Sequence, residues 1–183
     1  MILIDTILLC GNSEQKDVPD ELHGNELRGP TDRAAADKQL EWLDETLASG
    51  ADAPYAIVGG HYPVYSICEH GPTSCLIKEV LPILRKHRVT AYFNGHDHCA
   101  EHISGTSNAD PEFHTIGSAH ENNPSTDHLH TLQKGQLQWH TGKGKGGFGA
   151  VTVDADGLTV THFDGDGKEL YKAPKLKPRT NTL

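Results

Sequence analysis

The chain lacks the features that mark several large classes of protein. Its 183 residues are only 36% apolar and 6% aromatic, and no apolar run approaches the roughly 18 residues of a membrane-spanning helix. Basic residues number 16 against 25 acidic ones, so the formal net charge is -9. Because an acidic surface repels polyanions, we expect no nucleic-acid partner and no membrane partner.

Familiar catalytic motifs are also missing. The sequence contains no GxSxG nucleophile motif and no P-loop. The stretch "GKGKGGFG", residues 142–149, is glycine-rich and basic and could cradle a phosphate. Since it lacks the Walker spacing and a helix signal after it, a flexible loop is favoured.

The cysteines form no CxxC pair, which argues against a zinc knuckle. The four, Cys10, Cys68, Cys75 and Cys99, could form one or two disulfides or remain thiols. A chain of this length does not need covalent staples, so the count alone slightly favours thiols.

The opening residues "MILIDTILLC" have no basic region and no small-residue cleavage site, so they do not indicate a signal peptide. Residues 2–10 are nearly continuously apolar, which predicts a strand buried on both faces. Residues 11–32 are polar with Gly and Pro, which predicts a long exposed loop.

Periodicity predicts a layered α/β domain. A helix is expected where Ala36, Leu40, Leu43 and Leu47 share one face, starting at Thr31 or Asp32 and ending at Gly50. Further expected elements are a strand at 55–58, a helix at 74–87 broken or kinked by Pro82, a strand at 89–93, a weak pattern over 104–141, antiparallel hairpin strands over 146–174 and a frayed tail at 175–183. The alternation of strands and helices favours βαβ units in one domain, residues 1–183.

Histidines follow two of the expected strands directly. His61 comes after "VGG", and "NGHDH" places His96 and His98 after the next strand. Ligands bind at the carboxyl ends of strands in α/β sheets, so the three histidines can converge there as metal ligands. In an extended segment His96 and His98 share one face, while Asp97 points away and can support them. The alternative is a solvated polar turn.

Two further groups lie near these junctions. Glu69 and His70, in "EHGPT", could fold over the pocket, with His70 able to donate a proton. The alternative is a turn before a helix capped by Thr73. Cys99 is a possible thiolate ligand, although a small buried residue is the commoner role.

The stretches "IDTILLCGNS", "VGGHYPVYSICEHGPTSCL", "VTAYFNGHDH" and "GGFGAVTV" together resemble purple acid phosphatases, and most closely the small animal-type, tartrate-resistant members of these calcineurin-like metallophosphoesterases. The resemblance implies the C-terminal half of a four-layer α/β/β/α sandwich. It also implies a dinuclear centre of Fe(III) with Fe(II) or Zn(II), at which metal-bound hydroxide hydrolyses phosphomonoesters at acidic pH.

The resemblance assigns roles to individual residues. His98 would ligate the ferric ion, and His61 and His96 the divalent ion. Glu69 and His70 would lie near the substrate, where His70 would bind phosphate or protonate the leaving group.

The resemblance also pairs Cys10 with Cys75 in a disulfide, which reverses the preference for thiols. Such a bridge would stabilise the chain by about 4 kcal/mol on the chain-entropy model. It implies an oxidising compartment, so a secreted or lysosomal location is expected. Cys68 and Cys99 have no role in the family. The loop after Cys10 would match a segment that represses activity until it is cleaved.

The family's GDxG, GDxxY and GNH motifs do not occur in the sequence. They carry the other four metal ligands, so the chain has three of seven, all neutral imidazoles. We therefore expect a single incomplete domain, residues 1–183, from an acid phosphatase whose N-terminal half is absent and which is inactive alone. The alternatives are an inactive truncated paralogue that binds metal or regulates, and an unstable fragment.

Overall fold

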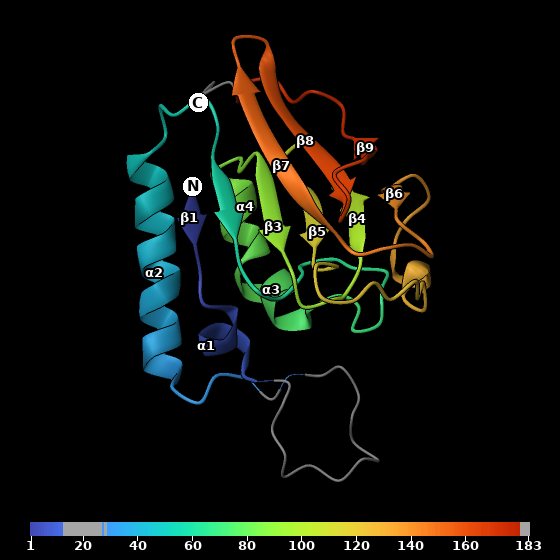
Figure 1. Ribbon diagram of the computed structural model, residues 1–183. Helices are drawn as coiled ribbons and strands as arrows, with labels where there is room; N and C mark the ends of the chain where they lie inside the picture. Colours follow the sequence, from blue (N-terminus) through green and yellow to red (C-terminus); the bar gives the residue numbers. More distant parts are fainter. Residues whose placement is uncertain (13–26, 28, 180–183) are drawn as a thin grey trace, which may run out of the picture.

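The computed structural model describes residues 1–12, 27 and 29–179 and shows a mixed α/β fold with two sheets (Figure 1). The larger sheet has the order β1-β2-β3-β5-β4-β6, and the smaller sheet has the order β7-β8-β9. The larger sheet is built from β1 (Ile2–Leu3), β2 (Ile57–Gly59), β3 (Ala91–Asn94), β4 (Ala100–Ile103), β5 (Glu112–Ile116) and β6 (Leu137–His140). The smaller one is built from β7 (Gly147–Asp154), β8 (Gly157–Asp164) and β9 (Glu169–Lys172).

Four strands of the larger sheet run parallel, and β4 and β6 are antiparallel to their neighbours. The helices are α1 (Thr6–Cys10), α2 (Arg33–Ser49), α3 (Ser74–Glu79), α4 (Leu81–Lys86) and a short 3-10 helix, η2 (Leu129–Thr131). No helix in the described part of the chain is long and apolar enough to cross a membrane.

Successive side chains of β2 and β3 point to opposite faces of the larger sheet and contribute to two separate hydrophobic cores. Val58 and Tyr92 are paired in the register and belong to the large core, which also contains the buried faces of the helices. Ile57 and Phe93 point the other way and pack with the smaller sheet, whose β8 contributes Val160. Helices, larger sheet and smaller sheet are thus stacked (Figure 1), while the complete four-layer sandwich remains an expectation.

The first predicted strand is wrong beyond Leu3. Residues 6–10 form α1, because Asp5 caps a helix there: its side chain accepts a hydrogen bond of 2.9 Å from the Leu8 N–H. Gly11, with a φ of 90°, ends the helix.

The second and third helices follow the predictions. Helix α2 starts after Asp32, whose carboxylate accepts from the Ala35 N–H at 3.0 Å, and it ends before Gly50. The expected break at Pro82 occurs as a junction at Val80, so that Pro82 lies in the first turn of α4, where its missing N–H costs nothing.

Strands β5 and β6 lie within the region where the sequence showed only a weak pattern. The buried positions of β4 and β5 carry His102 and His114, which are cross-strand partners. Because histidine fills positions normally held by apolar residues, the alternation that identifies a strand is hidden.

The prediction of a frayed tail is wrong up to residue 179. Leu176 exchanges two backbone hydrogen bonds with Leu158. The guanidinium of Arg179 donates to the carbonyl oxygens of Ala53, His87 and Gly50. Residues 180–183, and residues 13–26 and 28 of the predicted long loop, lie outside the described residues.

Candidate metal and catalytic site

The two strand–glycine–histidine junctions lie side by side, because β2 and β3 are adjacent and parallel. The Gly95 N–H donates to the His61 carbonyl at 3.2 Å, which ties one turn to the other. Gly60 is required for this approach: a Cβ there would lie 2.7 Å from the Tyr92 hydroxyl and 2.5 Å from the Thr6 side chain.

His96 lies at the centre of an aromatic cluster. Its Nδ1 is 3.1 Å from Nε2 of His61. Its ring stacks on that of His70 with centroids 4.4 Å apart and packs edge-on against Tyr62 at 4.6 Å. The structure therefore brings His61, His70 and His96 together.

His98 has a different environment. Its side chain is 42% exposed, and its Nδ1 lies 3.7 Å from a Glu121 carboxylate oxygen. The expectation of an extended HxH is wrong, because His96 has a φ of 62° and the Asp97 N–H bonds back to the Gly95 carbonyl at 2.8 Å. The histidines occupy a tight turn, so strand alternation does not direct them to one face.

The Asp97 side chain is hydrogen-bonded to the loop that carries Glu69 and His70. It is completely buried, and its Oδ1 accepts a 2.7 Å hydrogen bond from the backbone N–H of His70. Its Oδ2 has no hydrogen-bond partner in the described part of the chain. The carboxylate thus positions His70 through the main chain, and the predicted support of His96 and His98 by Asp97 stays a prediction.

Asn123 is a site residue that the sequence did not reveal. Its amide donates to Oε2 of Glu69 at 2.5 Å, and its backbone N–H donates to the His98 carbonyl at 2.6 Å. It lies in an irregular segment without periodicity, so no sequence signal pointed to it. Through this residue Glu69 and His98 are held together.

Burial controls the titration of two groups here. It lowers the pKa of His96 to about 3, with smaller contributions from the nearby His70, His61 and His98. A neutral imidazole keeps a lone pair for a metal ion. Burial also raises the pKa of Glu101 to about 7, although Ser66, the Ile67 N–H and Thr115 hydrogen-bond to its carboxylate.

All four cysteines form disulfides. The Cys10–Cys75 pair is confirmed, and the initial preference for thiols is wrong. A second bridge, Cys68–Cys99, was left open by the sequence and joins the residue before Glu69 to the residue after His98. Cys99 is therefore not a thiolate ligand in this oxidised state.

The residues fit part of a metal centre. Two nitrogens bound tetrahedrally at the usual Zn–N distance lie about 3.3 Å apart, and the His61 and His96 nitrogens lie 3.1 Å apart. His61, His96 and His98 do not form a group whose ligand atoms all lie within 4.8 Å of one another. Within the described residues, the group that meets this limit is Cys68, Cys99 and His140.

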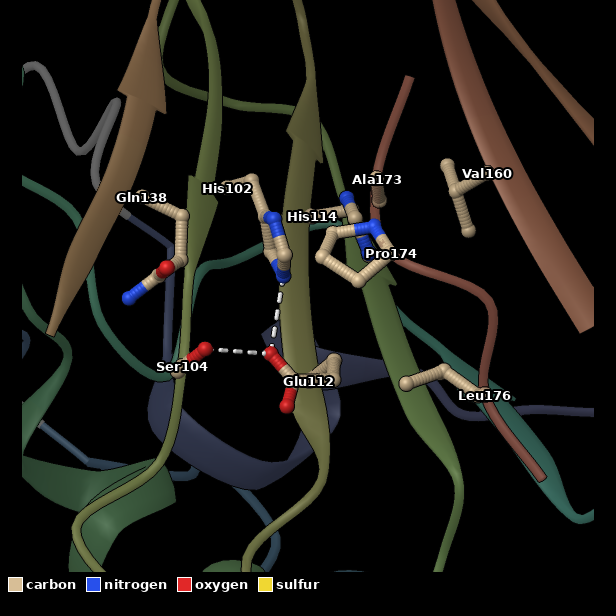
Figure 2. Close-up of a pocket in the computed structure, with 9 residues that line it drawn as sticks. All are labelled: His102, Ser104, Glu112, His114, Gln138, Val160, Ala173, Pro174 and Leu176. Atoms are coloured by element: carbon tan, nitrogen blue, oxygen red, sulfur yellow. Dashed lines mark hydrogen bonds and ion pairs between the residues drawn. The ribbon is translucent and has the colours of Figure 1, made fainter.

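A cavity of about 50 Å³ lies elsewhere, between the two sheets (Figure 2). Glu112 projects into it and accepts hydrogen bonds from Ser104 at 2.7 Å and from His102 at 2.8 Å. The other ring nitrogen of His102 lies 2.9 Å from the Tyr171 hydroxyl. This polar network links β4 and β5 to β9 and is separate from the candidate site.

A parallel sheet with histidines at the carboxyl ends of adjacent strands is the arrangement of a ligand-binding or metal-binding α/β protein. A comparison with protein families is more specific. Residues 5–100 match the family described as calcineurin-like phosphoesterase, and the chain belongs to this family.

Its relatives include tartrate-resistant acid phosphatase type 5 from Sus scrofa, which is 38% identical over 184 residues, covering 100% of this chain and 51% of the relative. The Homo sapiens protein of the same name is 36% identical, over 94% of this chain and 51% of the relative. Purple acid phosphatase 4 from Arabidopsis thaliana is 33% identical, over 67% of this chain and 34% of the relative. The chain spans about half the length of the tartrate-resistant acid phosphatases that it matches.

The comparison with solved structures supports the fold of the chain and nothing beyond it. GAP50, described as the anchor in the inner membrane complex of Plasmodium, matches with a TM-score of 0.74 at 21% identity, over 98% of this chain and 49% of that one. The purple acid phosphatase PPD1 from yellow lupin matches with a TM-score of 0.59 at 14% identity, over 74% and 27%.

Proposed function

We propose that this chain provides one half of an acid phosphatase that hydrolyses phosphomonoesters at a dinuclear metal centre. The observation that carries the proposal is the convergence of His61 and His96, 3.1 Å apart, at the carboxyl ends of two adjacent parallel strands. The acid phosphatase relatives, aligned over this whole region, support the reaction class.

The two ions are proposed to be Fe(III) with Fe(II) or Zn(II). His61 and His96 would hold the divalent ion, and His98 the ferric ion. When bound, such a pair polarises the phosphoryl oxygens as a Lewis acid. The chain's own part is to fix the imidazoles, and burial keeps His96 neutral for this purpose.

His70 and Glu69 are proposed to act on the substrate side. The stack of His70 on His96 and the hydrogen bond from the His70 backbone N–H to Asp97 support a role for this imidazole beside the proposed ion. There it would bind the phosphate or protonate the leaving oxygen. Glu69 is fixed by Asn123.

Three imidazoles cannot balance the charge of two iron-class ions, so we propose that anionic ligands complete the centre and that some of them come from further polypeptide. The surface is consistent with such an addition. On the edge strand β1, Leu3 is 69% exposed, and on β7, which is an edge of the smaller sheet, Val153 is 56% exposed. We propose that the chain is one incomplete phosphoesterase domain and that further strands cover these edges.

The two disulfides support folding in an oxidising compartment, and we propose a secreted or lysosomal location. The expected partner is a phosphomonoester, with no nucleic-acid or membrane partner.

Complementation tests the proposal. The chain replaces the matching half of the Sus scrofa relative, and the product is assayed on a phosphomonoester at acidic pH. We expect hydrolysis that falls at least about 100-fold in His96→Ala, because the loss of a ligand exceeds the 10- to 100-fold typical of outer-shell partners. Replacement of the exposed His130 by Ala is the matched control. A folded hybrid without activity, or full activity in His96→Ala, would refute the proposal.

A further inference from the structure

We propose a second, redox-dependent metal site: reduction of the Cys68–Cys99 disulfide creates, together with His140, a site for a thiophilic divalent ion such as Zn²⁺. The three residues come from separate segments, namely the loop before α3, the residue before β4 and the end of β6. The two sulfurs and one ring nitrogen of His140 all lie within 4.8 Å of one another.

The state of His140 is a second, independent observation. Its Nδ1 accepts a 3.1 Å hydrogen bond from the Gly142 N–H. Its Nε2 is buried and has no hydrogen-bond partner in the described part of the chain. A buried polar atom without a partner needs an explanation, and a ligand position is one. Burial also lowers the pKa of His140, which keeps the imidazole in its neutral, metal-binding form.

The chemistry balances with a reductant such as a phosphine. The S–S bond accepts two electrons and two protons and gives two thiols, while the phosphine takes an oxygen atom from water and becomes a phosphine oxide. The metal ion then replaces the two thiol protons, which are released. His140 binds through Nε2, so its ring proton moves to Nδ1 and the bond from Gly142 is given up. One neutral hydrogen bond is a small loss beside a metal–nitrogen bond.

The donor set suits zinc. Two thiolates balance the charge of a divalent ion, which three imidazoles do not, and thiolate with imidazole is a preferred zinc combination. Sulfur ligands of a tetrahedral zinc ion lie about 3.8 Å apart. The sulfurs must therefore separate, and reduction permits this. Three protein ligands leave the fourth position for water.

The other disulfide is an internal control. Cys10 and Cys75 belong to no comparable trio of ligands in the described part of the chain. The site does not depend on the proposed phosphatase function, because its ligands are distinct from His61, His96 and His98. It does border that region, since Cys68 precedes Glu69 and Cys99 follows His98.

Cobalt(II) reports on the site directly. The full chain is reduced with a phosphine, freed of reductant and titrated with Co²⁺, and the thiolate-to-cobalt charge-transfer band is recorded. We expect one Co²⁺ per chain with this band in the reduced protein and no band in the oxidised protein. His140→Ala should weaken binding at least about tenfold, while His130→Ala and the Cys10→Ser/Cys75→Ser double variant should keep the band.

Three results would overturn the proposal: no charge-transfer band after reduction, a band that survives Cys68→Ser/Cys99→Ser, or unchanged affinity in His140→Ala. If the serine variant does not fold, alkylation of the reduced wild-type protein gives the answer. Bound metal should protect Cys68 and Cys99 from the alkylating reagent, and protection of Cys10 and Cys75 instead would contradict the assignment.

Discussion

The backbone N–H of His70 donates a 2.7 Å hydrogen bond to Oδ1 of Asp97, a carboxylate that is completely buried. This contact joins the loop that carries the proposed substrate residues to the turn that carries the proposed metal ligands. The Asp97 side chain is therefore one of the contacts that set the position of His70 relative to His96, beside the Cys68–Cys99 disulfide and the stack of the two rings.

Removal of this contact should loosen the loop. We expect Asp97→Ala to lower the free energy of unfolding by about 2 kcal/mol, because the bond involves a charged acceptor. Asp97→Asn retains an oxygen for the His70 N–H and should cost clearly less. Urea unfolding of both variants checks this, and equal losses would show that the contact does not hold the loop.

Glu101 should make the protein more stable in acid. Its pKa is raised from 4.5 to about 7 by burial, so the folded state binds a proton more tightly than the unfolded state. The stabilisation is complete below pH 4.5 and is lost as the pH rises through 7, a change on the order of 3 kcal/mol.

Glu101→Gln should flatten this dependence. Urea midpoints at pH 5 and pH 8 measure it, with replacement of the exposed Glu45 by Gln as control. If the variant loses as much stability between pH 5 and pH 8 as the wild type, Glu101 is not the group responsible.

His162 should make the folded protein less stable in acid, which is the opposite of the effect of Glu101. It lies between the sheets, with Nε2 3.2 Å from Nδ1 of His114 and its ring against Trp139. Burial, and after it the charge of His102, lowers the pKa of His162 from 6.5 to about 4.

The stability due to neutral His162 is thus fully present above pH 6.5 and is lost as the pH falls towards 4, again on the order of 3 kcal/mol. His162→Phe keeps a ring in place and should remove most of this loss. Thermal melts from pH 7 to pH 4 test it, and an unchanged slope in the variant would contradict the assignment.

The Cys10–Cys75 bridge should contribute to stability through the unfolded state. Its ends are 65 residues apart in sequence, so the Cys10→Ser/Cys75→Ser double variant should lose about 4 kcal/mol. Denaturant unfolding under non-reducing conditions measures this. A loss below about 1 kcal/mol would mean that the 65-residue loop is already restricted in the unfolded chain.

Strong local signals were sufficient for much of the fold. Asp32 and Gly50 bound α2 because capping is local chemistry, and Pro82 separates α3 from α4 for the same reason. The apolar run after Met1 was misleading, since a single cap at Asp5 outweighed strand propensity. Strands β4, β5 and β6 were missed, and in β4 and β5 core positions carry His102 and His114 instead of apolar residues.

At the candidate site, sequence located the junctions but not the geometry. The pairing of His61 with His96 followed from adjacent parallel strands, a property of topology. The positive φ of His96, the bridging role of Asn123 and the second disulfide depend on contacts between distant segments. No spacing within one segment encodes such contacts.

The metal content of the hybrid with the Sus scrofa relative tests the central claim most directly. We expect two metal ions per molecule in the parent hybrid and in the His130→Ala control. We expect at most one in His96→Ala, because this variant removes a ligand of the divalent ion. Two ions retained in His96→Ala would show that the His61–His96 pair does not bind the divalent metal.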